Sequence, residues 1–182
     1  MRTPWGMSDS QEAYGPGITF YGTPGHGGFK VFKKLNRQIH ESCRIEDGWY
    51  EEDCDWAIVA VHFPDRFPSD VMESAWKTLR NWHPKAYETI TGKEIKPGES
   101  YKRDEEIFFR SHENDWVEVS HDRQEGGTVK MLAVKGGRGL WPNPKYPQGV
   151  HHPSVPKREF IVSEEEFESG WNQFGYVCEQ CA

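Results

Sequence analysis

The sequence predicts a single α+β domain with a helical N-terminal half, a small antiparallel sheet and a long Gly/Pro-rich loop near the C-terminus. Apolar residues recur at helical spacing between residues 50 and 112 and alternate at strand spacing between residues 116 and 134. Four glycines and five prolines fall within residues 136–156, where regular structure is not expected. A chain of 182 residues has room for one compact domain, or for a domain with an ordered appendage.

The order of segments follows from these patterns. We expect an irregular lead-in at residues 1–16, the main α+β body at 17–135, the Gly/Pro-rich loop at 136–157, and a strand, short helix and tail of the same domain at 158–182. The body opens with two short β-rich runs, which are joined by a connection from Gly22 to Gly28 that contains four glycines. Glycine permits either a tight hairpin loop or a loop whose amides hold an anion, and the sequence favours the hairpin.

Four helices are predicted in the main body. They are expected at residues 50–63, 69–83, 84–92 and 101–112. Glu51, Glu52 and Asp53 would occupy the first turn of the first helix, where the helix dipole favours anions. Ile107 and Phe108 are expected to face inward in the fourth.

A β-hairpin is predicted after the helices. Its strands are expected at residues 116–120 and 128–134, with a turn at 125–127. Val129 and Met131 should lie on one face of the hairpin, and Val134 on the other. A capping box that begins at Ser163 predicts a short final helix after one more strand.

Charge and hydropathy exclude two functional classes. The chain has 22 Lys and Arg against 29 Asp and Glu, a net charge of -7, which argues against a general nucleic-acid coat but leaves room for a local basic patch. The longest apolar run, residues 56–61, is far shorter than the roughly 20 residues of a membrane span. The N-terminus lacks the apolar stretch of a secretory signal, so we expect a cytoplasmic protein that does not contact a membrane.

The cysteines allow a weak case for zinc and no other cofactor is expected. Cys178 and Cys181 have the spacing of half a zinc site, which Cys43 and Cys54 could complete as a four-thiolate tetrahedron. The favoured interpretation is free thiols, with Cys54 buried in a helix.

One candidate site combines His26 with the predicted acidic helix start. On a helix, Glu51, Asp55 and His62 lie on approximately one side, so His26 could meet a carboxylate pair as an acid/base or hard-metal site. The alternative is that these residues are structural. The acidic side chains would then stabilise the N-terminus of the helix, and the histidines would make hydrogen bonds that stabilise the loop and the core.

A second candidate site is basic. Lys30, Lys33, Lys34 and Arg37 follow the glycine loop, so a phosphate-bearing ligand could bridge these cations and the loop at Thr23, Gly27 and Gly28. The alternative is a solvated charged face. In the Gly/Pro-rich loop, Trp141, Tyr146, His151 and His152 could stack on a base or grip a protein partner.

Two family resemblances add to these patterns. The run from Phe20 to Thr23 faintly resembles the strand-borne His/Tyr-Gly-Thr element of ADP-ribosyltransferases, which implies a later glutamate such as Glu51. Tyr21 stands where that family has histidine, and Glu51 falls on a predicted helix rather than a strand.

Several blocks together carry a more specific resemblance. They are Thr3-Pro4-Trp5-Gly6, Gly17-Ile18-Thr19-Phe20, Thr23-Pro24-Gly25-His26-Gly27-Gly28-Phe29-Lys30 and Gly48-Trp49-Tyr50-Glu51-Glu52-Asp53-Cys54-Asp55-Trp56. The combination resembles an uncharacterised domain family of bacteriophages, plasmids and other mobile elements, over about residues 3–120. The resemblance implies an accessory gene, a class that includes host-takeover and anti-defence proteins.

These observations give two functional hypotheses. The first is a phage or mobile-element accessory protein that binds a host protein or other macromolecule and inhibits or redirects it. The second is an enzyme or sequestering protein that handles a nucleotide through the glycine loop, His26 and the acidic cluster at Glu51.

Overall fold

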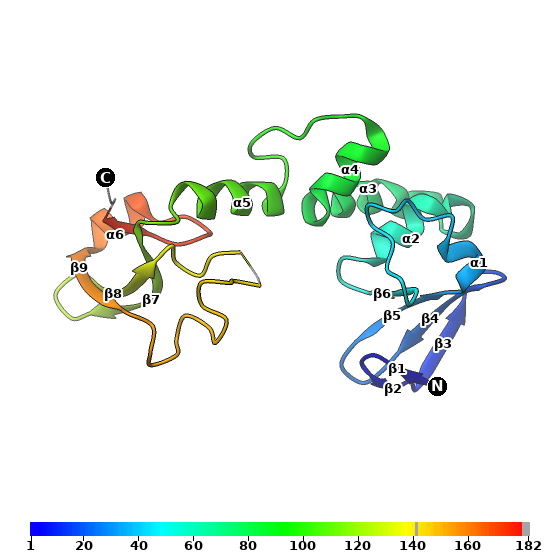
Figure 1. Ribbon diagram of the computed structural model, residues 1–182, viewed down its shortest axis with the longest axis horizontal. Helices are drawn as coiled ribbons and strands as arrows, with labels where there is room; N and C mark the ends of the chain where they lie inside the picture. The colour runs from blue at the N-terminus through cyan, green and yellow to red at the C-terminus, as the bar shows by residue number, and fades with distance from the viewer. Residues whose placement is uncertain (141, 180–182) are drawn as a thin grey trace. The chain divides into compact units, whose positions relative to one another are not determined.

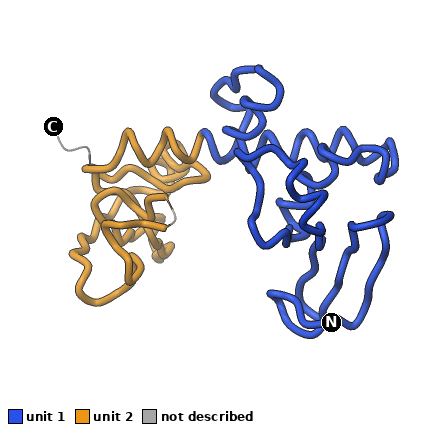
Figure 2. Tube along the Cα trace, turned by 45° about the vertical axis from the view of Figure 1, so that its right-hand side comes forward, with its two compact units in different colours: residues 1–103 blue, residues 104–182 orange. Residues whose placement is uncertain are grey.

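The computed structural model describes residues 1–140 and 142–179, and the chain divides into two compact units, Met1–Arg103 and Asp104–Ala182 (Figure 2). Each unit contains helices and antiparallel strands, which confirms the α+β class. The division into two units differs from the single domain expected from the sequence. Within the described ranges, no helix combines the length and the hydropathy needed to cross a membrane.

Unit 1 begins with strands rather than with an irregular lead-in. A small hairpin, β1 (Arg2–Thr3) and β2 (Gly6–Met7), precedes a four-stranded antiparallel sheet in the order β3-β4-β5-β6 (Figure 1). The strands of this sheet are β3 (Ser10–Ala13), β4 (Ile18–Gly22), β5 (Gly27–Val31) and β6 (Trp49–Glu51). The expectation of an irregular lead-in at residues 1–16 was wrong. The turn-forming residues in this segment make tight turns between short strands, and the last of these strands, β3, pairs with β4.

The first long helix starts later than predicted. Residues 49–51 form β6, and α2 covers only Trp56–His62. Tyr50 pairs with Phe29 across the sheet, and its hydroxyl donates to Asn36 Oδ1 at 2.6 Å and accepts from the Ile45 amide at 3.1 Å. These long-range bonds fix Tyr50 in a strand although its apolar spacing continues that of the helix.

The remaining helices lie close to their predicted positions. They are α3 (Met72–Trp82), α4 (Pro84–Thr91) and α5 (Tyr101–Ser111), with 3-10 turns at Pro64–Arg66 and Ser69–Val71. The four-residue helix α1 (Lys33–Asn36) was not among the predicted helices. Gly92 ends α4 in the left-handed conformation. The prediction for α5 was wrong at Ile107, which is 48% exposed, whereas Phe109 is buried against Phe108 and Phe174.

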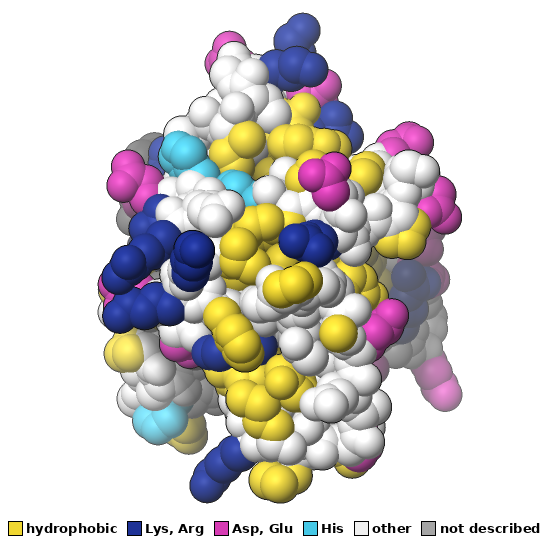
Figure 3. Space-filling view, turned by 90° about the vertical axis from the view of Figure 1, so that its right-hand side faces the viewer, with side chains coloured by type: hydrophobic (Ala, Val, Ile, Leu, Met, Phe, Trp, Pro, Cys, Tyr) yellow, Lys and Arg dark blue, Asp and Glu magenta, His cyan; other side chains and the backbone are white. Residues whose placement is uncertain are grey.

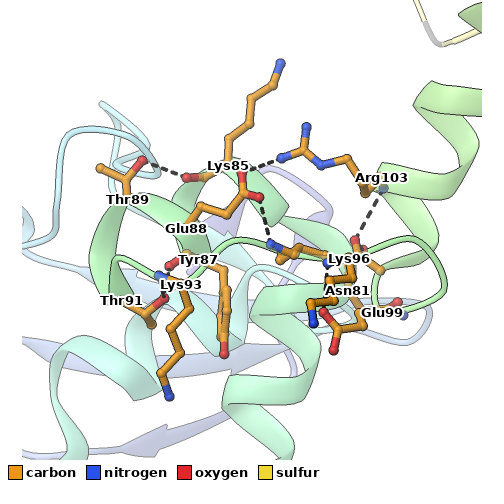
Figure 4. Close-up of polar contacts among 12 residues, drawn as sticks. Asn81, Lys85, Tyr87, Glu88, Thr89, Thr91, Lys93, Lys96, Glu99 and Arg103 are labelled. Carbon is orange, nitrogen blue, oxygen red and sulfur yellow. Dashed lines mark hydrogen bonds and ion pairs between the residues drawn. The ribbon is translucent and has the colours of Figure 1, made fainter.

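Polar contacts hold the connection between α4 and α5 within unit 1 (Figure 4). Glu88 accepts the Ile95 amide at 3.0 Å and pairs with Arg103. Asn81 accepts the Tyr101 amide at 2.7 Å and so satisfies one of the free donors at the start of α5. Residues 97 and 98 form a turn within this connection.

One hydrophobic core joins the sheet of unit 1 to its helices. Its buried residues come from β4, β5, β6, α2 and α3 and from the segment after α1: Ile18, Phe29, Val31, Ile39, Tyr50, Ala57, Ile58, Val59, Ala60, Ala75 and Leu79. Each of these side chains is at most 5% exposed. This core fixes the relative positions of all the elements that carry the candidate site.

Unit 2 is a four-stranded antiparallel sheet with a hydrophobic cluster on each face. The sheet order is β10-β7-β8-β9, with strands β7 (Trp116–Gln124), β8 (Thr128–Lys135), β9 (Arg158–Ser163) and β10 (Val177–Glu179), and α6 spans Glu164–Gly170. The predicted division of the faces is confirmed: Val129 and Met131 pack with Phe167 of α6, and Val134 packs with Tyr146. Ser163 caps α6 by accepting the Glu166 amide at 3.1 Å, as predicted.

Candidate functional site

The glycine-rich connection is a hairpin loop, as the sequence favoured. Gly22 pairs with Gly27 at the end of the β4–β5 ladder. The Thr23 amide donates to the His26 carbonyl at 2.7 Å, and the His26 amide donates to Thr23 Oγ1 at 3.1 Å. Two amides of the loop are therefore bonded inside it, and they do not form the open cradle that a phosphate would need.

Close packing explains the glycines at the base of this hairpin. A Cβ atom on Gly28 would lie 2.5 Å from the Tyr50 carbonyl oxygen and 2.2 Å from the ring of Trp5. A Cβ atom on Gly27 would lie 2.5 Å from Glu52 Oε2. Gly27 and Gly28, predicted as ligand-binding residues, thus allow side chains of the same unit to approach the backbone.

His26, Glu51 and Glu52 come together beside this loop. One potential ligand atom from each lies within 4.8 Å of the others, and His26 Nδ1 is 4.0 Å from Glu52 Oε1. Imidazole and carboxylate groups at this spacing are able to hold a divalent cation. However, Glu51 already accepts the amides of Asp53 at 2.8 Å and Cys54 at 3.2 Å, so its carboxylate holds the turn after β6.

Asp55 does not belong to this cluster. The prediction that it shares a helix face with Glu51 was wrong, because Glu51 lies on β6 and α2 begins after Asp55. Asp55 Oδ1 instead lies 3.1 Å from His83 Nε2, at the junction of α3 and α4. The three candidate catalytic residues therefore do not meet in one site.

His62 is a structural histidine. Its Nδ1 lies 2.7 Å from the Ile58 carbonyl and its Nε2 accepts the His40 amide at 3.0 Å, an arrangement that requires a neutral ring protonated on Nδ1. Burial lowers the pKa of His62, which favours this neutral form. The ring joins the end of α2 to the segment after α1.

The predicted basic residues fall into two groups. Lys30 is engaged within unit 1, since its ammonium group donates to the Asp47 carbonyl and lies 4.8 Å from the centre of the Trp49 ring. Lys33, Lys34 and Arg37 are exposed on α1 and at its C-terminal end. Only the second group is presented to solvent as a possible contact surface.

The described cysteines give no support for zinc. Burial raises the pKa of Cys43 and Cys54, and it raises that of Cys178 to about 12, which favours the neutral thiol in the metal-free protein. Among the described residues, no three histidine, cysteine or acidic side chains that include a cysteine lie close enough to share an ion. Cys181 lies outside the described residues. Cys54 occupies the turn before α2 and is only partly buried, so its predicted place in a helix was wrong.

The candidate binding residues of the Gly/Pro-rich loop differ in burial. Trp141 lies outside the described residues. Tyr146 is 9% exposed, and its hydroxyl donates to the Lys135 carbonyl at 3.0 Å, so it anchors the loop to the sheet. His151 and His152 are exposed, and His152 Nδ1 lies 2.8 Å from Ser154 Oγ.

The structure changes one of the two differences between this chain and the ADP-ribosyltransferase pattern. Glu51 lies on a strand, which removes one of the two departures from that pattern. Tyr21 is buried, with its ring centre 5.7 Å from that of Trp49, and the oxygens of Glu51 are bonded to backbone amides. Both side chains thus stabilise the fold of unit 1.

The sequence analysis missed a pair of titratable residues in unit 2. The carboxylate of Glu118 lies 3.1 Å from Nδ1 of His121, at a cavity of about 340 Å³ that Arg138 also lines. Regular alternation would place residues 118 and 121 on opposite faces of a strand. The register shift between Glu118 and Ser120 places both on the face that also carries Ala133 and Met131, and no sequence pattern signalled this bulge.

Comparison with known proteins identifies a family but no described activity. No curated protein and no solved structure gave a significant match to the chain. A family described as a domain of unknown function, DUF7007, matches residues 1–113, which include all of unit 1 and continue through α5. The match covers more than half of the 182 residues, and the chain therefore belongs to the DUF7007 family.

Proposed function

We propose that the protein is an accessory factor of a phage or other mobile element that binds a macromolecule in the host cytoplasm and thereby inhibits or redirects it. A host defence complex is one target of this class. The observation that carries the proposal is an exposed basic and aromatic surface on unit 1, here called the α1 surface. It consists of Phe32, Lys33, Lys34, Arg37 and Arg66.

The α1 surface places an apolar ring among cations. Phe32, which immediately precedes α1, is 53% exposed. Lys33, Lys34 and Arg37 are also exposed. Figure 3 shows Lys and Arg side chains gathered beside hydrophobic ones on the face of unit 1 that it views. Aromatic and arginine side chains are enriched where protein interfaces gain most of their binding energy.

Buried contacts hold this surface in place. Asn36 is 5% exposed, donates to the Ile45 carbonyl at 2.7 Å and accepts the Tyr50 hydroxyl. Ile39, one turn further on, is fully buried in the core. The cations of α1 therefore project from a rigid base, which reduces the entropy that a partner must remove on binding.

Arg66 extends the surface across the turn between β3 and β4. A Cβ atom on Gly15 would meet the guanidinium of Arg66 at 2.3 Å, and one on Gly17 would lie 3.9 Å from Cβ of Phe32. Arg66 and Phe32 thus flank the same turn. A surface with this charge favours an acidic partner, either nucleic acid or an acidic protein.

The chemistry around the glycine loop supports binding over catalysis. The amides of Thr23 and His26 are bonded inside the loop, Glu51 caps a turn, and Asp55 pairs with a different histidine. The nucleotide-handling hypothesis relied on these groups being directed at a ligand. In contrast, the side chains of Lys33, Lys34 and Arg37 are exposed to solvent.

Retention of host material on the immobilised protein tests the proposal. We expect the variant Lys33→Glu/Lys34→Glu/Arg37→Glu to retain about tenfold less of a specific host component than the wild type, because the charge reversal opposes an acidic partner. Nuclease treatment before capture separates the two partner classes. Loss after nuclease identifies nucleic acid, and persistence identifies protein.

The matched control reverses three exposed lysines elsewhere in unit 1, Lys77→Glu, Lys93→Glu and Lys96→Glu, so both variants change the net charge equally. These positions lie on α3 and after α4, away from the α1 surface in the sequence. Equal losses for the two variants would show that only net charge matters, and retention unaffected by the α1 variant would refute the proposal.

A further inference from the structure

We propose that the cavity of unit 2 lined by Glu118, His121 and Arg138 is a binding site for a small molecule that combines a planar ring with an anionic group. The cavity has a volume of about 340 Å³ and is lined by residues of β7 and of the segment after α6, together with Arg138. This volume falls within the usual range of ligand pockets. The site is independent of the α1 surface, because every lining residue lies in unit 2.

The floor of the cavity holds a fixed carboxylate and imidazole pair. Glu118 is 5% exposed, and its Oε1 lies 3.1 Å from Nδ1 of His121. The ring of His121 also contacts Phe167, with centroids 4.8 Å apart. Since Nδ1 is engaged by Glu118, Nε2 is the ring nitrogen with which His121 can contact a ligand.

A backbone irregularity creates this pair. Glu118 is paired with Ala133 and Ser120 with Leu132, so Val119 is the extra residue of a β-bulge. Bulges re-aim side chains and occur frequently beside functional sites. A buried carboxylate is costly unless it has a partner, and here its partner is a histidine that lines a cavity rather than a lysine or arginine of a structural ion pair.

Arg138 gives the cavity its anion preference. Unit 2 has 8 Lys and Arg against 14 Asp and Glu, and Arg123, Lys130 and Arg158 form ion pairs with glutamates. Among the described residues, Arg138 has no such carboxylate partner, and its hydrogen bond is to the Val119 carbonyl at 3.5 Å. The guanidinium therefore keeps donors for a carboxylate or phosphate.

Trp171 supplies a surface for a ring. Its side chain is 48% exposed although it lines the cavity, and Phe174 lies on the same segment. A partly exposed tryptophan that lines the same cavity as an arginine is suited to stack on a planar group while the guanidinium holds a charge on the same ligand. The combination recognises the ring and the anion together, and recognises either part alone more weakly.

Fluorine NMR of the full chain labelled with 5-fluorotryptophan tests the site, with the Trp171 signal assigned by Trp171→Phe. The probes are phenyl phosphate and benzoate, with benzyl alcohol as the ring alone and inorganic phosphate as the anion alone. We expect at least one of the two ring anions to shift the Trp171 signal saturably below about 5 mM, and the tighter one identifies the preferred anion. Benzyl alcohol and inorganic phosphate should both bind more weakly.

Two substitutions complete the test. Arg138→Gln should weaken binding of the preferred probe about tenfold, because it removes the charged donor to the anion. His121→Ala should also weaken it about tenfold, because it leaves the Glu118 carboxylate without its partner beside the bound anion. Arg110→Gln is the matched control, since Arg110 lines a different cavity of unit 2. The proposal is overturned if the ring anions give no saturable shift, if either cavity substitution leaves affinity unchanged, or if Arg110→Gln has an equal effect.

Discussion

The two units of the protein use their polar residues differently. Unit 1 is nearly neutral, with 14 Lys and Arg against 15 Asp and Glu, whereas unit 2 has 8 against 14. In unit 1, the residues that look most like a site, such as His26, Glu51 and His62, bond to the backbone or lie in an exposed cluster. In unit 2, Glu118 and His121 belong to no recognisable motif and yet line a cavity.

This difference teaches that a distinctive sequence block can report on folding rather than on chemistry. In the β4–β5 hairpin, Gly28 is required by the approach of the Trp5 ring and the Tyr50 carbonyl, and Gly27 by the approach of Glu52. Function in unit 1 is better sought on its exposed cations, which are individually unremarkable in the sequence. Function in unit 2 depends on a bulge that has no sequence pattern.

The largest expected effect concerns the cores. Leu79→Ala removes a fully buried side chain from the single core of unit 1 and should lower the free energy of unfolding by about 2–5 kcal/mol. Met131→Ala is the equivalent change in unit 2, where the cluster is smaller and lies against α6. Hydrogen exchange read by mass spectrometry measures the loss of protection segment by segment.

We expect Leu79→Ala to reduce protection most strongly in β4, β5 and α2, the elements that share its core. Met131→Ala should act first on β8 and α6. A uniform loss across all strands for either variant would contradict the division into two compact units.

The sequence predicted much of the fold where local pattern and packing agree. Helices α3, α4 and α5, the β7–β8 hairpin and the Ser163 cap were all foreseen, because their apolar spacing, glycine stops and capping residues act over short distances. The β4–β5 hairpin was also foreseen, from two β-rich runs and a glycine connection.

The errors arise where long-range contacts override local spacing. Tyr50 continues a helical pattern, but its hydroxyl bonds to Asn36 and Ile45 and its backbone pairs with β5, so the segment is a strand. Because residues 49–51 form a strand, Glu51 and Asp55 do not lie on one helix, and the predicted helix face that they would share does not exist. The Glu118–His121 pair was missed for the converse reason, since a bulge rather than the alternation decides which face each residue occupies.

The second effect tests whether glycines of unit 1 serve packing. Gly28→Ala should lower the free energy of unfolding by about 1–3 kcal/mol, because the new methyl group would meet the Tyr50 carbonyl oxygen, which cannot move aside as a side chain can. Gly25→Ala is the control in the same loop, since a Cβ atom there meets nothing within 4 Å. Equal effects in thermal denaturation would show that loop flexibility, and not close approach, matters.

The third effect is a pH dependence that belongs to unit 1. Burial holds the pKa of folded His62 below its ordinary value of 6.5, so the unfolded chain binds this proton more readily than the folded one. The stability contributed by the neutral ring is therefore complete above about pH 6.5 and falls as the pH drops through 6.5 toward the lower folded pKa. His62→Gln should reduce this slope and cost about 1–2 kcal/mol at pH 8, where the wild-type ring is neutral. Denaturant titrations at pH 5, 6, 7 and 8 measure the slope, and an unchanged slope in the variant would assign the pH dependence to other groups.

The smallest expected effect concerns the N-terminal caps of the helices, which differ between the two units. Helices α2, α3 and α4 of unit 1 start without a side-chain cap, whereas α6 of unit 2 starts with the Ser163 hydroxyl accepting the Glu166 amide. Ser163→Ala should therefore cost about 1 kcal/mol and speed amide exchange in the first turn of α6, and Ser163→Asp should restore both. In unit 1, Asp55 precedes α2 without capping it, and its carboxylate lies 3.1 Å from His83 instead. If Ser163→Ala leaves exchange in α6 unchanged, the packing of Phe167 alone holds that helix, and the two units begin their helices in the same way.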